Sequence, residues 1–419
     1  MKKLIFIVSL VLIFLSTTSL ASEKISEVDA LKKQLDRVYD LAASQPLIKN
    51  QADLTFYQAI DYPEFPLNAF SNEHVRQDFI ESIRFSEKGL AGFNSETLTT
   101  LSYADAYKLL SLFGQSYLAE HIVSPEVATN KSTVIKPYLS NAEYPILAQV
   151  RAIDNLDKSD TDRLAAFKAF YQNTLTPSLQ EADCSERAHN DTMAVLDAFY
   201  LINFYSDDKV MAEQHLACFN AFASHFPDSK YLSIVAEGVY KSLLSSRQLS
   251  QAENLQQLYP KMNVGELPKI KSLSINGPSV YRIDSDEKTL VQRAFTFKTE
   301  PEVIVIAHPY CHFCQFMIKD INADKVLKAF FKQHSRWLAD ENYLDHVDAL
   351  MSWNKEYPMA RLDIAYLKQD FTQLDNWGTP TIYFLVDGKV VDKIVGWPQQ
   401  GQKELLNKKI KNHFPGFKG

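Results

Sequence analysis

The stretch that decides the fold is residues 302–314, which read Glu302-Val303-Ile304-Val305-Ile306-Ala307-His308-Pro309-Tyr310-Cys311-His312-Phe313-Cys314. Its first half is a run rich in β-branched residues, which is typical of a buried strand. A helical pattern begins at Gln315, directly after the second cysteine. The stretch therefore predicts a Cys-x-x-Cys pair at the junction between a strand and a helix.

The position of the pair predicts different roles for its two cysteines. A cysteine at a helix N-terminus faces unpaired backbone N–H groups and the positive end of the helix dipole. Both stabilise the thiolate, which is the attacking species. Cys311 is therefore the expected nucleophile, and Cys314, one turn inside the helix, is the expected resolving thiol. The alternative is a zinc or copper site in which His308 and His312 complete the ligand set.

A second motif follows at residues 377–396. It contains Trp377-Gly378-Thr379-Pro380-Thr381, a strand over 382–386, the turn Asp387-Gly388, a strand over 389–395 and Gly396. Taken with the cysteine pair, this order resembles the thioredoxin superfamily over approximately residues 275–415. The resemblance implies a cis bond before Pro380, across from the dithiol, where the backbone of Thr379 can pair with an extended substrate.

Three departures from thioredoxin narrow the resemblance. Between the dithiol and Pro380 lie 65 residues, and the excess is expected to be a helical insertion at about 323–355, which resembles the bacterial periplasmic Dsb oxidases and isomerases. Thr379 before the proline resembles the DsbC and DsbG isomerase branch. Val305 stands where thioredoxin has a buried acid, so His308 or water would have to assist proton transfer instead.

His312 is expected to tune the redox behaviour of the pair. A histidine in the first helical turn donates to, or when protonated attracts, the Cys311 thiolate. This stabilises the reduced form and makes the disulfide more oxidising, which favours a role other than strong reductant. A solvated, uninvolved His312 is the alternative.

The beginning of the chain has the pattern of a secretory signal peptide. Lys2-Lys3 precede an apolar run over 4–15, and the segment ends in Ser19-Leu20-Ala21, which predicts cleavage after Ala21. The run has 12 residues, fewer than the roughly 20 of a membrane-spanning helix. An uncleaved anchor is the alternative. Export to a bacterial periplasm is expected, a compartment where dithiols cycle and disulfides persist.

Charge limits the kinds of partner. Removal of residues 1–21 takes away two lysines and no acidic residue, which leaves 42 basic and 51 acidic residues and a formal charge of −9. Nucleic acid is therefore not expected as a partner. The expected partners are protein clients with thiols or disulfides, with a membrane redox partner as a further option, and no cofactor is expected. A helical pattern over 28–42 leaves a homodimer open.

Glycine divides the mature sequence into two parts. Residues 22–264 contain four glycines, whereas the shorter segment 265–419 contains eight. Few positions that need positive φ and many periodic segments predict an all-helical domain over 22–264, with a weak resemblance to a tetratricopeptide-type solenoid. Residues 265–419 are expected to form the thioredoxin-like α/β domain, with short strands over 279–283 and 290–295 and a connecting helix over 367–377.

Two further cysteines, Cys184 and Cys218, lie in the helical part. In an exported protein, an even pair outside the active site is most simply a structural disulfide. Two buried free thiols and a second redox pair are the alternatives, and the sequence alone does not choose among them.

These observations favour a periplasmic thiol-disulfide oxidoreductase of the oxidase or isomerase type that acts on protein disulfides. The expected site residues are Cys311, Cys314, His312, Thr379 and Pro380. A thioredoxin-like reductase for cytochrome maturation, of the TlpA-like kind, is the runner-up. A helical scaffold that binds copper or zinc is the rival from another functional class.

Overall fold

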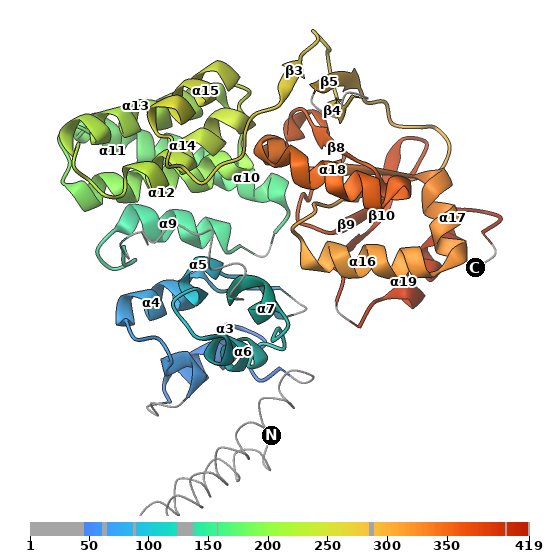
Figure 1. The fold of residues 1–419 in the computed structure, drawn as a ribbon, viewed down its shortest axis with the longest axis horizontal. Coiled ribbons are helices and arrows are strands. Elements are labelled where there is room, and N and C mark those ends of the chain that lie inside the picture. The colour runs from blue at the N-terminus through green and yellow to red at the C-terminus, as the bar shows by residue number, and fades with distance from the viewer. Residues whose placement is uncertain are drawn as a thin grey trace, which may run out of the picture. The chain divides into compact units, whose positions relative to one another are not determined.

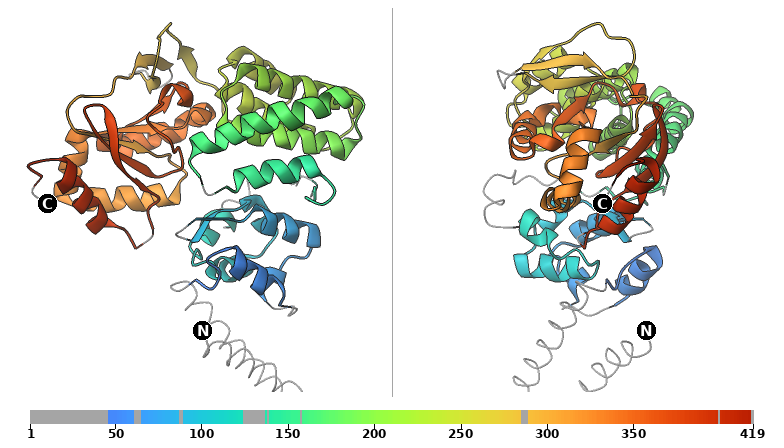
Figure 2. Two further views of the ribbon diagram at one scale, coloured as in Figure 1. Left: turned by 180° about the vertical axis from the view of Figure 1, so that it is seen from behind. Right: turned by 90° about the vertical axis from the view of Figure 1, so that its right-hand side faces the viewer.

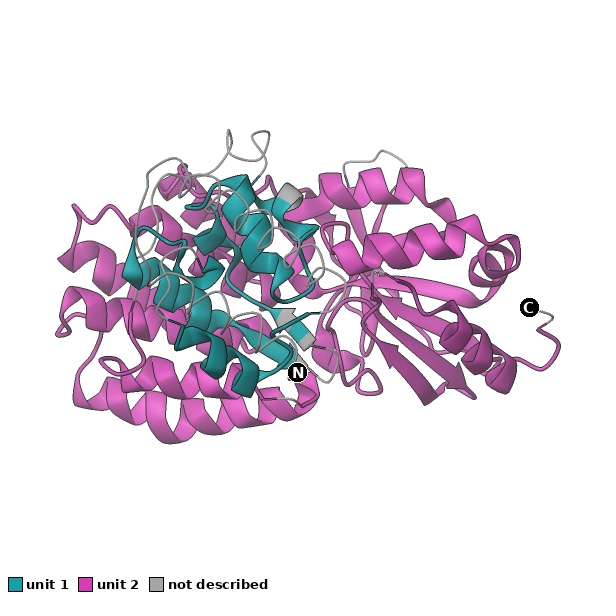
Figure 3. Ribbon diagram, turned by 90° about the horizontal axis from the view of Figure 1, so that it is seen from below, with its two compact units in different colours: residues 1–131 teal, residues 132–419 magenta. Residues whose placement is uncertain are grey.

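The computed structural model describes residues 46–60, 65–86, 89–123, 137, 139–156, 158–284, 289–398 and 400–417. The predicted signal peptide at 1–21 and the helical pattern at 28–42 lie outside the described residues. The chain divides into two compact units, Met1–Lys131 and Ser132–Gly419 (Figure 3). In the described parts of the chain, no helix is both long and apolar enough to span a membrane.

The first unit combines short helices with a small sheet. Its helical elements are α3 (Gln51–Gln58), η2 (Pro66–Asn68), α4 (Glu73–Ser82), α5 (Ser95–Leu98), α6 (Tyr103–Ser111) and α7 (Leu118–Val123). They surround a buried core that includes Phe79, Leu109 and Phe113. Strands β1 (Arg84–Ser86) and β2 (Gly89–Gly92) pair in an antiparallel fashion. The expectation of an all-helical segment over 22–264 is therefore corrected.

The end of a flexible side chain lies close to Gly92 across this hairpin. A Cβ atom on Gly92 would lie 2.8 Å from Nη2 of Arg84, the residue paired with Gly92 across the hairpin. Gly89 and Gly92, two of the four glycines in residues 22–264, therefore belong to a strand within the segment that composition predicted to be helical.

The second unit begins with a helical bundle. Its members are α9 (Pro145–Asp154), α10 (Asp160–Phe170), α11 (Thr176–Glu181), α12 (His189–Tyr205), α13 (Lys209–His225), α14 (Leu232–Ser245) and α15 (Leu249–Leu258), with a π-helical turn at Tyr171–Leu175 between α10 and α11. Helix α12 packs against α9, α13 and α14, and α14 packs against α15 (Figure 1). This is the pattern of neighbours that stacked helical hairpins produce.

A disulfide ties two parts of the bundle together. The Sγ atoms of Cys184, in the segment after α11, and Cys218, in α13, lie 1.96 Å apart. Both residues are buried in the same apolar core. The pair is therefore bonded, as the sequence led us to expect, and the alternative of two buried free thiols does not describe this structure.

The remaining part of the second unit contains a mixed sheet of eight strands, in the order β10-β9-β6-β7-β8-β4-β5-β3. Their bounds are β3 (Lys269–Lys271), β4 (Ser279–Ile283), β5 (Thr289–Ala294), β6 (Glu302–Ile306), β7 (Ser335–Ala339), β8 (Leu362–Ala365), β9 (Thr381–Val386) and β10 (Lys389–Val395). Strands β6, β7 and β8 are parallel neighbours, whereas β9 pairs antiparallel with both β6 and β10.

Helices and turns cover both faces of this sheet (Figure 2). The helical elements are α16 (His312–Ala323), α17 (Lys325–His334), η4 (Glu341–His346), α18 (Val347–Glu356), η5 (Pro358–Ala360), η6 (Lys368–Asp370) and α19 (Lys403–His413). Val303 and Val305 on one face of β6 join the core formed with α16 to α19. Ile304 and Ile306 on the other face pack with the segment around Phe371. Burial on both faces explains why β6 is a continuous apolar run.

Two expectations for the α/β part are corrected. The predicted helical insertion at 323–355 contains the central strand β7 between α17 and η4. The segment 367–377, which we expected to be a connecting helix, has only the three-residue turn η6. Strand β7 was missed because Arg336 interrupts its apolar pattern, although its guanidinium reaches the buried carboxylate of Glu302 in β6 at 2.6 Å.

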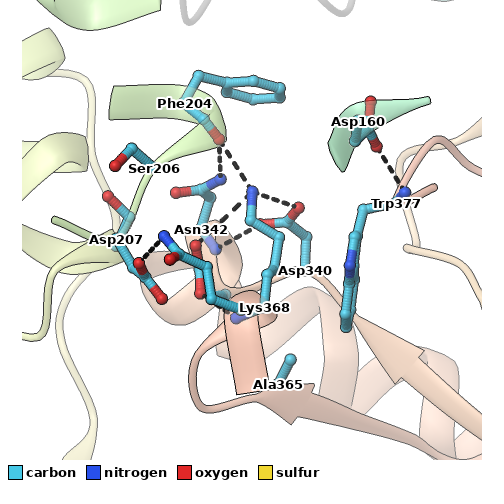
Figure 4. Close-up of polar contacts among 12 residues, drawn as sticks. Asp160, Phe204, Ser206, Asp207, Asp340, Asn342, Ala365, Lys368 and Trp377 are labelled. Carbon is cyan, nitrogen blue, oxygen red and sulfur yellow. Dashed lines mark hydrogen bonds and ion pairs between the residues drawn. The ribbon is translucent and has the colours of Figure 1, made fainter. Parts of the chain in front are cut away.

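Polar contacts join the bundle to the sheet within the second unit. The guanidinium of Arg247, at the corner between α14 and α15, donates to the carbonyl oxygens of Tyr366 and Ala365 at 2.6 and 2.7 Å. The ammonium of Lys368 donates to the carbonyl oxygen of Phe204 at 2.9 Å and lies 3.2 Å from the carboxylate of Asp340 (Figure 4). Composition therefore changes near residue 264, but the helices from α9 onward share one compact unit with the sheet.

Candidate active site

Cys311 caps the N-terminus of α16, directly after β6. Its backbone is extended, with φ −82° and ψ 111°, and its Sγ accepts a hydrogen bond from the backbone N–H of Cys314 at 3.2 Å. The side-chain Nε2 of Gln315 donates to the carbonyl oxygen of Pro309 at 2.9 Å, which fixes the loop that leads into the helix. The strand-to-helix junction predicted from the sequence is therefore present, and it points the sulfur at unpaired helical N–H groups.

The two thiols differ in their ease of ionisation. Burial raises the pKa of Cys311, but hydrogen bonds from Cys314, Thr379 and the backbone N–H of Phe313 outweigh it and bring the pKa below its usual value. Burial raises the pKa of Cys314 well above its usual value, and the neighbouring Cys311 raises it further. A proton therefore leaves Cys311 first, and a thiolate there is the more available nucleophile.

The loop before β9 lies against the dithiol. The Thr379–Pro380 peptide bond is cis, and Cys311 Sγ lies 3.5 Å from the carbonyl oxygen of Thr379. Strand β10 ends beside this loop, where the N–H of Gly396 donates to the carbonyl oxygen of Pro380 at 2.8 Å. The structure thus brings together Cys311, Cys314, Thr379 and Pro380, which the sequence places 65 residues apart.

The cis-proline loop also has a contact with the bundle. A carboxylate oxygen of Asp160, the first residue of α10, accepts a hydrogen bond from the backbone N–H of Trp377 at 2.6 Å (Figure 4). In return, the N–H of Asp160 donates to the carbonyl oxygen of Asp375 at 3.0 Å. These contacts hold the chain just before Thr379, so the bundle helps to position the loop that faces the dithiol.

A layer of histidine and tyrosine rings surrounds the other side of the dithiol. The ring of His308 stacks on that of Tyr343 with their centroids 4.5 Å apart, and Tyr310 meets His346 edge-on at 5.3 Å. Burial raises the pKa of Tyr343 well above its usual value, with further contributions from Asp340 and the two cysteines. The phenol of Tyr343 therefore keeps its proton and is a hydrogen-bond donor.

His308 is not arranged as a base. Burial lowers its pKa to about 4, Asp340 opposes this effect, and His346 and His312 add to it. Its Nδ1 accepts a hydrogen bond from the backbone N–H of Tyr310 at 3.1 Å, which assigns the ring proton to Nε2. A neutral imidazole with its acceptor nitrogen occupied is a poor proton acceptor for Cys314. Proton transfer through His308, which we expected as one of two routes, is therefore disfavoured relative to water.

His312 is the first residue of α16 and is partly exposed. Hydrogen bonds from the side chains of Cys314 and Thr379, and from the backbone N–H groups of Cys314 and Phe313, are what most lower the pKa of Cys311. His312 acts electrostatically on His308, whose pKa it lowers. Its expected influence on the redox behaviour of the dithiol therefore remains a prediction.

The metal alternative finds no assembled ligand set. Within the described residues, no group of three or more histidine, cysteine, aspartate or glutamate side chains has an arrangement that could hold a metal ion. Cys311 Sγ accepts a hydrogen bond from the backbone N–H of Cys314, and His308 Nδ1 accepts one from the backbone N–H of Tyr310. Two of the four expected metal-ligand atoms therefore already have hydrogen-bond partners. Metal binding there would require these contacts to break.

Sequence reasoning missed the residues that other elements bring to the site. Tyr343 and His346 come from η4, and Asp160 comes from the bundle. No motif marks them, because their roles depend on tertiary packing alone.

Comparison with protein-family models, curated proteins and solved structures finds no match to this chain.

Proposed function

We propose that this protein is an exported thiol-disulfide oxidoreductase of the oxidase or isomerase type that acts on protein disulfides. The observation that carries the proposal is the helix-capping position of Cys311, whose Sγ accepts the Cys314 N–H at 3.2 Å. A dithiol in which one pKa lies below its usual value and the other well above it has a nucleophile and a resolving thiol. The contact between Cys311 and the Thr379 carbonyl supports a mechanism of the thioredoxin type.

Thiol-disulfide exchange at this site proceeds in two steps. The Cys311 thiolate attacks one sulfur of a client disulfide, a mixed disulfide forms, and the other client sulfur leaves as a thiolate. Cys314 then loses its proton and attacks Cys311 Sγ, which releases the second client thiol and leaves a Cys311–Cys314 disulfide. The reverse sequence oxidises a client dithiol. In isomerisation, the released client thiolate attacks a second client disulfide, and the thiolate displaced from that disulfide attacks the client sulfur bonded to Cys311, so that the Cys311 thiolate leaves.

Helix α16 favours the first step in both directions. Its unpaired N–H groups and dipole stabilise negative charge on Cys311, both as attacking thiolate and as leaving group. The carbonyl oxygen of Thr379 lies next to this sulfur, where the backbone of an extended client strand can reach it. The exposed ring of Tyr310, directly before Cys311, adds an apolar contact on the solvent side.

Trapping of the mixed disulfide tests the proposal. Cys314→Ser removes the resolving thiol, so client proteins should remain linked to Cys311 on a non-reducing gel. Cys311→Ser removes the attacking thiol and should give no such adducts. Peptide mapping of the adducts should find the client bonded to Cys311 and not to Cys184 or Cys218, because these two sulfurs are bonded to each other. Equal trapping by both active-site variants would refute the assignment of roles.

A further inference from the structure

A pocket lies between the bundle and η4, on the side of Tyr343 that faces away from His308. It has a volume of about 80 Å³ and is lined by Tyr200, Asn203, Phe204, Lys241, Ser242, Asn342, Tyr343 and His346. This volume exceeds the roughly 30 Å³ of one water molecule and suits a single side chain or small acid. A hydrogen bond joins the bundle wall of the pocket to the wall formed by η4, because Asn342 Nδ2 donates to the carbonyl oxygen of Phe204 at 3.3 Å (Figure 4).

Only one layer of rings separates this pocket from the dithiol. Tyr343 lines the pocket and also stacks on His308, whose carbonyl oxygen accepts the N–H of Cys311 at 3.2 Å. The charge of either cysteine thiolate acts on the phenol of Tyr343. His346, another lining residue, contacts the exposed ring of Tyr310. The side of the pocket at His346 therefore lies next to the exposed residue that precedes Cys311, on the side from which a client disulfide approaches.

The pocket is lined by one cation, two phenols and several amide and hydroxyl groups, and the amide oxygen Oδ1 of Asn203 is an acceptor among them. Lys241 is the one lining residue with a permanent positive charge, and none of the ion pairs within 4.0 Å in the described residues involves it. The phenol of Tyr343 stays protonated. Tyr200 lies close enough to Tyr343 for their hydroxyl groups to interact electrostatically. An ammonium and two phenols around one small volume match the acceptor oxygens of a carboxylate.

Other charged groups near the pocket must be counted as well. Asp345 lies behind His346, with its carboxylate oxygen 3.6 Å from His346 Nε2. Burial raises the pKa of Asp345, and burial lowers the pKa of His346, so both groups are shifted toward their neutral forms. Lys241 acts electrostatically on both groups, so an entering carboxylate shares its ammonium with Asp345.

We propose that this pocket is a carboxylate subsite that selects disulfide substrates with an acidic group next to the reacting sulfur. The inference rests on the proposed function of the dithiol. The carboxylate comes either from an aspartate or glutamate side chain of a client chain or from a small carboxylated thiol. It accepts from the Lys241 ammonium and the phenols of Tyr200 and Tyr343, while its neighbouring sulfur reaches Cys311.

The test compares matched disulfides that differ only in the acid. One arm uses model peptides that contain a disulfide and carry glutamate or glutamine beside the cysteine. The other arm uses dithiodiglycolate and the uncharged hydroxyethyl disulfide. For the wild-type full-length protein, we expect kcat/KM to favour the acidic member by about tenfold in at least one arm. A preference in the peptide arm alone assigns the subsite to client chains, and one in the small-molecule arm alone assigns it to a small thiol.

Variants connect the preference to the pocket. Lys241→Met should lower the ratio of acidic to neutral kcat/KM by about tenfold, and Tyr200→Phe should lower it less, because it removes one donor and no charge. Lys261→Met is the matched control, since Lys261 is exposed and does not line the pocket. Circular dichroism and thermal unfolding check the fold of each variant, and the ratio itself is insensitive to the fraction of active protein.

Failure of this inference is distinguishable from failure of the proposed function. Exchange with hydroxyethyl disulfide that depends on Cys311, without any preference for an acid, would overturn the subsite and leave the oxidoreductase intact. A preference that survives unchanged in Lys241→Met would overturn it as well. Absence of Cys311-dependent exchange with every disulfide would instead refute the proposed function.

Discussion

Removal of the bundle disulfide should destabilise the protein by a calculable amount. Cys184 and Cys218 are separated by 34 positions in sequence. For a closed loop of that length, the chain-entropy relation gives a stabilisation of about 3.8 kcal/mol at 25 °C, through restriction of the unfolded chain. Both residues are also buried, at 5% exposure each, so alanine replacements lose some packing in addition. We therefore expect Cys184→Ala with Cys218→Ala to lower the free energy of unfolding by about 4 kcal/mol.

The measurement must isolate the bundle from the dithiol. We would place both alanines in a protein that already carries Cys311→Ser and Cys314→Ser, so that no other thiol forms or exchanges disulfides. Urea unfolding followed by circular dichroism gives the loss of stability, and hydrogen exchange of the α13 amides reports the bundle separately. Because reduction of the parent protein breaks the same bond without deleting sulfur atoms, it controls for packing. A loss below about 1 kcal/mol in both comparisons would refute the loop-entropy reasoning.

Two further predictions concern the contacts between bundle and sheet. Burial raises the pKa of Glu341 to about 8, so the folded protein holds a proton there that the unfolded chain releases above about 4.3. The free energy of unfolding should therefore fall as pH rises from about 4.5 to 8, by at most about 1.4 kcal/mol per pH unit. In urea unfolding, Glu341→Gln should flatten this slope, and equal slopes for the wild type and the variant would contradict the reasoning. Asp160→Ala removes the acceptor of the Trp377 N–H, so hydrogen exchange of that amide should accelerate by about tenfold or more, whereas Asp162→Ala, at an exposed position of the same helix, should leave it unchanged.

Much of the sheet could be predicted because its strands carry their own signal. Strand β9 and most of β6 are apolar runs, whereas β4 and β10 are rich in β-branched or aromatic residues interrupted by polar ones, and the Asp387-Gly388 turn joins β9 to β10. Both Asp387 and Gly388 have positive φ, at 50° and 68°, which is the backbone conformation that favours these two residue types in tight turns. Local sequence and tertiary structure agree in these elements.

The elements that were missed depend on contacts distant in sequence. Strand β7 contains Arg336, a residue that a local pattern assigns to a surface, yet its guanidinium is held by Glu302 and stacks 3.8 Å from the ring centroid of Phe295. The segment 367–377 has helical composition, but Lys368 is held by Asp340 and the Phe204 carbonyl instead of continuing a helix. Tertiary contacts override local propensity in both places.

The candidate site divides in the same way. Cys311 and Cys314 were found from the sequence because a helix cap is a local feature, and the second motif identified Thr379 and Pro380. The carboxylate subsite was not found, since Lys241 and Tyr200 lie in separate bundle helices and meet Tyr343 only in the folded unit. Residues that act through packing between the bundle and the sheet leave no signal at a fixed spacing.

The rate of alkylation of each active-site thiol as a function of pH tests the central claim most directly. Protein that is reduced at the dithiol would be treated with iodoacetamide over a range of pH, and mass spectrometry would count the label on Cys311 and Cys314 separately. We predict that Cys311 is labelled first at mildly acidic pH, with an apparent pKa below the usual value of about 8.5 for a cysteine. Earlier labelling of Cys314, or an apparent pKa of Cys311 above that value, would contradict the account.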